Sequence, residues 1–187
     1  MLVLASASPR RREVLSNAGL RFEVRPASID ERPEAGESAE ACVIRLARAK
    51  AEAVVLNAGE VVLGADTVVR VDGMILGKPA SSEDAARMLH LLSGRWHEVL
   101  TGVCVRSSSR SFVDTVTTRV HMLPIDQGEI DEYVRGGEPM DKAGAYAIQG
   151  IASRFIDRIE GCYFNVVGLP VARVFELYRR MAGELPG

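Results

Sequence analysis

The sequence predicts an α/β protein: a mixed, twisted sheet with flanking helices, arranged as one two-lobed domain over residues 1–187. Strand and helix patterns alternate over the first half of the chain, which is typical of parallel strands joined by helices. Two long alternating stretches in the second half, joined by a Ser-rich turn, predict an antiparallel hairpin. A chain of 187 residues can bury one substantial core but is short for two ordinary domains.

The first half is expected to alternate strands with helices. Ser38 is a good N-cap and Gly59 a good stop signal, and between them apolar residues recur at spacings of three and four, which predicts a helix. The segment from Val61 to Val71 is apolar except at Asp66, Thr67 and Arg70, and this pattern predicts a mostly buried strand. The expected elements are strands at 2–5, 22–24 and 61–71, helices at 9–18 and 38–56, and an acid-rich polar loop at 27–37.

The second half is expected to contain more antiparallel structure. Asp72-Gly73 is typical of a tight hairpin turn. Ser81, with Asp84 three residues on, predicts a helix start, and Ser93-Gly94 predicts its end. The expected elements are a helix at 81–93, hairpin strands at 98–106 and 112–121, a helix at 126–134, short strands at 143–148 and 155–159, and a closing helix at 169–181.

Composition and charge exclude several classes of protein. The formal net charge is -2, so no overall attraction to nucleic acid is expected. No apolar run suits a secretory signal or a membrane helix, which predicts no membrane partner. The three cysteines are widely spaced and odd in number, and the three histidines lack metal-ligand spacing. We therefore expect a cytoplasmic protein without a zinc site or disulfide framework.

The start of the chain predicts an anion site. Ser8 and Pro9 suit the N-cap and first position of a helix, which then begins with Arg10, Arg11 and Arg12. Positive charges are unfavourable there unless an anion binds, and phosphate is the commonest such anion. Helical spacing directs Arg10 and Arg11 toward the protein and Arg12 toward solvent. The alternative is that the arginines pair with carboxylates elsewhere in the fold.

Asp66 is the strongest candidate for a catalytic group. It lies in an apolar strand, where an unpaired carboxylate would cost several kcal/mol. The compensating cation could be a metal ion, Lys50, Lys78 or one of the arginines. A buried salt bridge is the structural alternative, but the adjacent Thr67 and the nearby glycine favour a site that a ligand approaches closely.

Three further charged residues are candidates with weaker support. Lys78 lies in the constrained turn Gly77-Lys78-Pro79, from which an ammonium could reach a phosphate, although turn lysines are usually solvated. Lys50 flanks the apolar stripe of its helix, so spacing alone favours a stem that lies along the apolar surface with its ammonium in water. Glu31 lies in the acidic loop and could bind Mg²⁺, although loop acids are mostly solvated.

Six short motifs occur in order along nearly the whole chain. Each is weak alone, but the ordered set is specific and resembles the motifs of the Maf proteins, a family of nucleoside triphosphate pyrophosphatases. The motifs are Ser6-Ala7-Ser8-Pro9-Arg10-Arg11, Gly64-Ala65-Asp66-Thr67, Gly77-Lys78-Pro79, Ser93-Gly94-Arg95 with His97 and Thr101-Gly102, Asp141-Lys142-Ala143-Gly144-Ala145-Tyr146 with Gln149-Gly150, and Asn165-Val166-Val167-Gly168-Leu169-Pro170.

The resemblance implies a fold similar to that of the inosine triphosphate pyrophosphatases and hydrolysis of a nucleoside triphosphate to its monophosphate and pyrophosphate. Arg10, Thr67 and Gln149 stand where the family sets its base preference, as in the subgroup acting on dTTP and UTP. The subgroup acting on 7-methyl-GTP has Trp, Gln and Glu there instead. The implied role is to limit incorporation of non-standard nucleotides. The alternative is a nucleotide-binding regulator of septum formation with little turnover.

The resemblance also implies roles for individual residues. By position, Asp66 would be the catalytic acid–base residue, and the resemblance implies dependence on a divalent cation. The chemistry of the reaction predicts that Glu31 and Asp66 hold this cation, Mg²⁺ or alternatively Mn²⁺, and leaves open whether Asp66 acts mainly as base or as metal ligand. The expected partner is a small-molecule nucleoside triphosphate, and a homodimer formed through the exposed hairpin is left open. The residues expected to bind phosphate are Ser6, Arg10, Arg11, Lys50 and Lys78.

Overall fold

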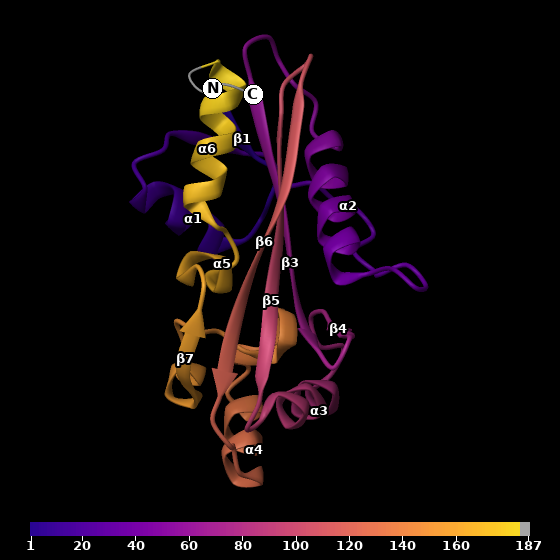
Figure 1. Ribbon diagram of the computed structural model, residues 1–187, viewed down its shortest axis with the longest axis vertical. Helices are drawn as coiled ribbons and strands as arrows, with labels where there is room; N and C mark the ends of the chain where they lie inside the picture. The colour runs from indigo at the N-terminus through magenta and orange to yellow at the C-terminus, as the bar shows by residue number, and fades with distance from the viewer. Residues whose placement is uncertain (184–187) are drawn as a thin grey trace. The chain divides into compact units, whose positions relative to one another are not determined.

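The computed structural model describes residues 1–183 and contains a mixed seven-stranded sheet with flanking helices (Figure 1). The strand order is β2-β1-β3-β5-β6-β7, and β4 pairs with β3. The α/β prediction is therefore confirmed. The strands are β1 (Leu2–Leu4), β2 (Phe22–Val24), β3 (Val61–Val71), β4 (Met74–Leu76), β5 (Trp96–Arg106), β6 (Ser111–Met122) and β7 (Ile156–Glu160).

The helical elements of the described residues include four short ones, one α-helix and three 3₁₀ segments, as well as the five longer helices that periodicity predicts. The α-helices are α1 (Pro9–Asn17), α2 (Ala39–Glu52), α3 (Ser82–Leu92), α4 (Gln127–Arg135), α5 (Tyr163–Val167) and α6 (Val171–Ala182). The 3₁₀ segments are η1 (Glu138–Asp141), η2 (Ala143–Ala145) and η3 (Ile151–Phe155). None of the helices within residues 1–183 has the length and apolar character needed to cross a bilayer.

The sheet combines parallel and antiparallel pairs. Strand β1 pairs in parallel with both neighbours, so that Leu2 lies opposite Phe22 on β2 and Val61 on β3. The β3–β4 and β6–β7 pairs are antiparallel. Parallel strands need crossover connections, and α1 and α2 occupy the connections that follow β1 and β2.

The chain forms two compact units. The first contains residues 1–66, 101–116 and the C-terminal segment from Gly168 onward, and the second contains residues 67–100 and 117–167. The division passes through β3, β5 and β6, so each of these strands contributes to both units. Within β3, the boundary lies between Asp66, which belongs to the first unit, and Thr67, which belongs to the second.

In the first unit, α2 lies very close to the sheet. A Cβ atom added at Gly64 on β3 would lie 2.1 Å from the Ala47 carbonyl oxygen, and one added at Gly102 on β5 would lie 2.1 Å from the Val43 carbonyl oxygen. Helix and strand backbones thus meet almost directly at two glycines, and small residues such as Ala51 fill the layer between them. Figure 1 shows α2 on one side of these strands and α1 and α6 on the other.

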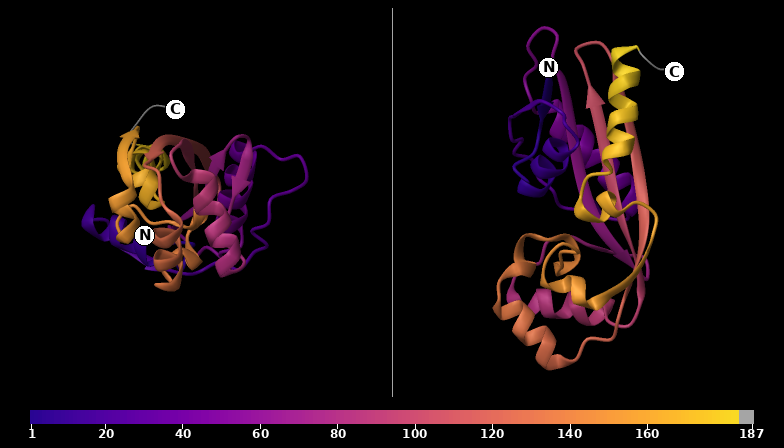
Figure 2. Two further views of the ribbon diagram at one scale, coloured as in Figure 1. Left: turned by 90° about the horizontal axis from the view of Figure 1, so that it is seen from below. Right: turned by 90° about the vertical axis from the view of Figure 1, so that its left-hand side faces the viewer.

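In the second unit, a large apolar core lies between the sheet and the helices. The right-hand view of Figure 2 shows the helices of this unit, α3 and α4 among them, on one side of its strands. Tyr133 on α4 meets Phe155 on η3 edge to face, with 6.2 Å between ring centroids. The fully buried core residues of this unit include Leu89, Leu92, Val120, Met122 and Ile130.

Three local predictions are wrong. Residues 143–148 do not form a strand, because Gly144 and Ala145 adopt left-handed φ angles of 68° and 61°, which bend the chain into η2. Helix α2 ends at Glu52 rather than at residue 56, and the chain turns at Gly59 (φ 76°) before it enters β3. The closing helix starts at Val171, and a separate short helix, α5, precedes it.

We expect Gly102→Ala to destabilise the protein strongly. The new methyl group would overlap the Val43 carbonyl, and separating α2 from β5 should lower the free energy of unfolding by about 3 kcal/mol or more. Urea unfolding measures this. Gly77→Ala is the control, because a Cβ there meets nothing within 4 Å. Equal stability of the two variants would contradict the close packing of α2.

Candidate functional site

Lys50 is the cation that compensates Asp66. Its Nζ lies 2.6 Å from Asp66 Oδ1, and both side chains are more than nine-tenths buried. Lys50 occupies the last turn of α2, and Gly64 lets that helix approach β3 closely enough for the ammonium to reach the carboxylate. The prediction that Lys50 extends its ammonium into water is therefore wrong. Close packing of α2 on the strand, which spacing within the helix does not reveal, decides its direction.

A second carboxylate reaches the same ammonium. Glu31, in the loop between β2 and α2, places Oε1 2.7 Å from Lys50 Nζ, and its side chain is 41% exposed. Glu31 is thus an ion-paired residue at the edge of the site rather than an ordinary solvated loop acid. The structure brings together Glu31, Lys50 and Asp66, three residues that the sequence identified separately.

Arg11 donates hydrogen bonds to two backbone carbonyls and a hydroxyl. Its Nε donates to the Gly168 carbonyl at 2.9 Å, and its Nη1 donates to the Ala65 carbonyl at 2.8 Å and to Ser6 Oγ at 3.2 Å. Burial lowers the pKa of this guanidinium, and the nearby carboxylates of Asp66 and Glu31 oppose this effect. Arg11 therefore connects Ser6, just after β1, and Ala65, within β3, to Gly168, which lies between α5 and α6. Ala65 directly precedes the catalytic candidate Asp66.

The N-terminus of α1 matches the sequence prediction. Ser8 is the N-cap and accepts a hydrogen bond from the Arg11 backbone N–H at 3.4 Å, and Pro9 occupies the first turn. No acidic residue lies in that turn. Arg10 is half-buried and Arg12 is exposed, as helical spacing predicts. An anion at this helix end would meet positive side chains as well as the helix dipole.

Within the second unit, the segments that carry Lys78 and Gln149 are joined. The Gly144 N–H donates to the Gly77 carbonyl at 3.0 Å, and Gly144 packs so tightly on Val69 that an added Cβ would lie 2.7 Å from a Val69 methyl carbon. Lys78 and Gln149 are both exposed. The turn next to Gly77 and the segment after Gly144 therefore have a fixed relation to each other.

A buried polar pair supports the same segment. His97 Nε2 lies 2.7 Å from Tyr146 Oη, and the rings meet edge-on with centroids 5.3 Å apart. Burial lowers the pKa of His97 to about 4 and raises the pKa of Tyr146. Both residues belong to the ordered motifs, but nothing in their spacing predicts that they contact each other. The pair fixes the backbone three residues before Gln149.

The comparison with protein families decides the classification of the chain. A family model described as Maf-like protein matches residues 1–181. The chain belongs to the Maf family. The resemblance predicted from the ordered motifs is thereby confirmed, and it covers both compact units of the Maf chain.

Relatives are similar to this Maf protein over nearly their full length. A protein from Koribacter versatilis (strain Ellin345), named dTTP/UTP pyrophosphatase, is 53% identical over 185 residues, covering 98% of this chain and 95% of that protein. One from Anaeromyxobacter sp. (strain Fw109-5) with the same name is 54% identical over 190 residues, covering 99% and 91%. A solved structure of a HAM1 protein from Coxiella burnetii matches at a TM-score of 0.51 and 15% identity, covering 98% of each chain, which shows a common fold.

The carboxylates of the Maf site suit a metal that also binds substrate. Within residues 1–183, no group of three or more His, Cys, Asp and Glu side chains is placed to hold a metal ion. Glu31 and Asp66 nevertheless converge on one point, the Lys50 ammonium. Mg²⁺ commonly takes one or two carboxylates and completes its coordination with water and substrate phosphates. The two carboxylates fit such an ion.

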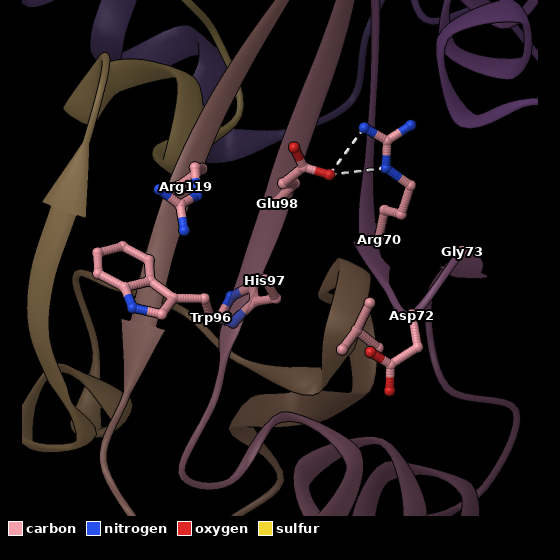
Figure 3. A pocket seen from close by; sticks show the side chains of 8 residues that line it. Arg70, Asp72, Gly73, Trp96, His97, Glu98 and Arg119 are labelled. Atoms are coloured by element: carbon pink, nitrogen blue, oxygen red, sulfur yellow. Dashed lines mark hydrogen bonds and ion pairs between the residues drawn. The ribbon is translucent and has the colours of Figure 1, made fainter.

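A separate pocket of about 380 Å³ lies on the sheet of the second unit (Figure 3). Arg70 points toward Glu98, with 2.8 Å from Nε to Oε2, and the Arg119 guanidinium lies 4.5 Å from the centre of the Trp96 ring. The remaining acid in its lining, Asp72, pairs with an arginine outside the pocket. None of the residues predicted for the Maf site lines this pocket, and its charged groups pair with other protein groups.

Replacing Arg11 by Met should destabilise the Maf fold. The carbonyls of Ala65 and Gly168 would lose buried donors, at about 1–3 kcal/mol each, so we expect the free energy of unfolding to fall by about 3 kcal/mol. Denaturant titration measures the change. Arg12→Met removes an exposed charge from the same helix and should have little effect. Similar losses in the two variants would show that the carbonyl contacts of Arg11 are unimportant.

Acid should destabilise the protein through His97. Its folded-state pKa of about 4 lies below the reference value of 6.5, so the unfolded chain binds more protons between these pH values. Stability should fall as pH drops from about 6.5 to about 4, by up to about 3 kcal/mol from this residue alone. In His97→Gln the slope should flatten, whereas the exposed control His90→Gln should retain it. An unchanged slope in His97→Gln would refute this assignment.

Proposed function

We propose that this chain hydrolyses dTTP and UTP to the monophosphate and pyrophosphate. The observation that carries the proposal is its identity of more than half, over nearly the whole chain, to two proteins named dTTP/UTP pyrophosphatase. The buried Lys50–Asp66 pair with Glu31 at its edge supplies groups that such a reaction needs. A general role in limiting incorporation of non-standard nucleotides would follow from that activity.

The triphosphate would be held mainly by positive charge. We place phosphate oxygens at the N-terminus of α1, near Ser6 and Arg10, with Lys50 as a further ligand. Arg11 would add its charge while its hydrogen bonds remain with the protein. Lys78 is proposed as another phosphate contact. Such a set of cations stabilises charge that grows on the phosphoryl oxygens and on the departing pyrophosphate.

A divalent cation fits this proposal. Glu31 and Asp66 are the residues that would hold it, with Mg²⁺ favoured and Mn²⁺ as the alternative. When bound, such an ion neutralises phosphate charge and lowers the pKa of a coordinated water molecule. The protein's own contribution is to keep two ionised carboxylates close together, which the Lys50 ammonium makes favourable.

The reaction requires water to attack the α-phosphorus. A bond forms between the water oxygen and the α-phosphorus, the bond from the α-phosphorus to the bridging oxygen breaks, and pyrophosphate leaves with the electron pair. Asp66 would orient the attacking water or accept its proton. The hydrogen bond from Arg11 to the Ala65 carbonyl would keep the backbone next to Asp66 in place during this step.

The base preference is proposed to depend on Arg10, Thr67 and Gln149. A glutamine amide carries both a donor and an acceptor, so Gln149 can pair with O4 and N3–H of uracil or thymine. A carboxylate at the same position could only accept hydrogen bonds. The contacts of Gly144 and Tyr146 would keep the Gln149 segment in a fixed conformation for this recognition.

A panel of natural and modified nucleoside triphosphates with Mg²⁺ tests the function. We expect dTTP and UTP to give monophosphate and pyrophosphate at higher kcat/KM than purine nucleotides. Release of orthophosphate in place of pyrophosphate would contradict the proposed bond cleavage. Tight binding in calorimetry without turnover would instead support a nucleotide-sensing regulator.

Asp66→Asn should abolish pyrophosphate release while preserving the fold. The amide keeps the shape of the side chain but cannot accept a proton or hold a cation, so we expect kcat to fall by about 100-fold or more. Circular dichroism checks the fold. Asp72→Asn, which changes an exposed aspartate paired with Arg95, is the matched control and should keep its activity. Turnover retained in Asp66→Asn would remove this residue from the mechanism.

A further inference from the structure

Lys50 occupies the position in which two carboxylates would otherwise meet a divalent cation. Its Nζ is 2.6 Å from Asp66 Oδ1 and 2.7 Å from Glu31 Oε1, so a single ammonium bridges both acids. The Arg11 guanidinium also lies near Asp66 and Glu31, but Lys50 is the cation that bridges the two carboxylates. Without the ammonium, two ionised carboxylates would lie together with Asp66 almost fully buried, which is unfavourable unless another cation binds.

The backbone that carries Lys50 is packed against the sheet, whereas its ammonium stands at the end of a flexible stem. Lys50 lies in α2, whose backbone is pressed against Gly64 of β3. The lysine side chain has a flexible four-carbon stem and a compact charge with three donors, so its head group can change partners without movement of the helix. A phosphate oxygen is a suitable replacement partner for the ammonium.

We propose that Lys50 is an exchangeable counter-ion of Glu31 and Asp66. In the nucleotide-free protein, it neutralises the two carboxylates and competes with free divalent cations. When the cation arrives with a triphosphate, the Lys50 ammonium transfers to a phosphate oxygen and leaves both carboxylates to the cation. This inference rests on the proposed function of the site. It adds the condition that the cation and the nucleotide bind together.

The exchange explains why one lysine can serve both states of the site. A permanently unpaired Asp66 in an apolar strand would destabilise the free protein. A permanently bound ammonium would prevent the carboxylates from sharing a cation with substrate. Because the triphosphate supplies new negative charge, it can draw away the ammonium at the moment when the cation takes its place.

The test uses Mn²⁺ alone, without nucleotide, and measures its binding by electron paramagnetic resonance. Lys50→Met removes the ammonium and leaves a side chain of similar length. We expect this variant to bind Mn²⁺ about 10-fold more tightly than the unmodified protein, since two carboxylates would be left without their cation. Arg48→Met removes an exposed charge from the same helix and should change the affinity less than about 2-fold.

A second readout covers the case in which Lys50→Met is unstable. Mn²⁺ should then raise its thermal unfolding temperature far more than that of the unmodified protein, because a ligand that binds only the folded state stabilises it. Adding Asp66→Asn to Lys50→Met should remove the gain in either readout. Failure of Lys50→Met to gain in both Mn²⁺ affinity and Mn²⁺-dependent thermal stability would overturn the exchange.

A separate activity assay distinguishes failure of the proposed exchange from failure of the proposed function. The unmodified protein is assayed for release of pyrophosphate from dTTP in the same preparations. Turnover there, combined with no Mn²⁺ effect in Lys50→Met, would reject the exchange and leave the enzymatic function intact. A gain of Mn²⁺ binding without turnover in the unmodified protein would support the exchange of cations and reject the enzymatic function.

Discussion

The structure of the site depends on one interaction, the ion pair between the Asp66 carboxylate and the Lys50 ammonium. A carboxylate in an apolar strand is tolerable only when a cation meets it, and here the cation comes from a helix packed against the same strand. Gly64 and Gly102 permit that packing, because any side chain there would collide with α2. The glycines of the sheet and the charges of the site are therefore parts of one arrangement.

Two of the three arginines at the start of α1, Arg10 and Arg11, differ in their surroundings. Arg11 points inward and binds backbone carbonyls, so its guanidinium acts as a connector between chain segments. Arg10 remains half-buried at a helix end that has no acidic residue in its first turn. A run of similar residues can thus combine a buried structural charge with a half-buried one, and Arg10, the half-buried one, is the residue that we propose for phosphate binding.

Much of the architecture is predictable from the sequence, because hydrophobic periodicity and capping residues act locally. The helix after Ser8 and the strand from Val61 to Val71 occur as expected. The apolar pattern of residues 143–148 predicts a strand. Two residues of this segment, Gly144 and Ala145, have left-handed backbone conformations that the pattern does not indicate. A conformation that depends on Gly144 packing against Val69 belongs to the tertiary structure and leaves no periodic signal.

The same distinction applies to the site. The cost of burying Asp66 can be inferred from the strand around it, but the choice among several possible partners cannot. That choice depends on how closely α2 approaches β3, and spacing within the helix suggested a solvated Lys50 instead. The carbonyl partners of Arg11 were equally unpredictable, since every residue has a carbonyl and only the fold selects Ala65 and Gly168.

The most direct test is a crystal structure with Mg²⁺ and a dUTP analogue whose α,β-bridging oxygen is replaced by a non-hydrolysable group. We expect a metal ion bound by Glu31 and Asp66 and the Lys50 ammonium on a phosphate oxygen. A nucleotide bound with its α-phosphate away from Asp66, while Lys50 still bridges the two carboxylates, would contradict this expectation.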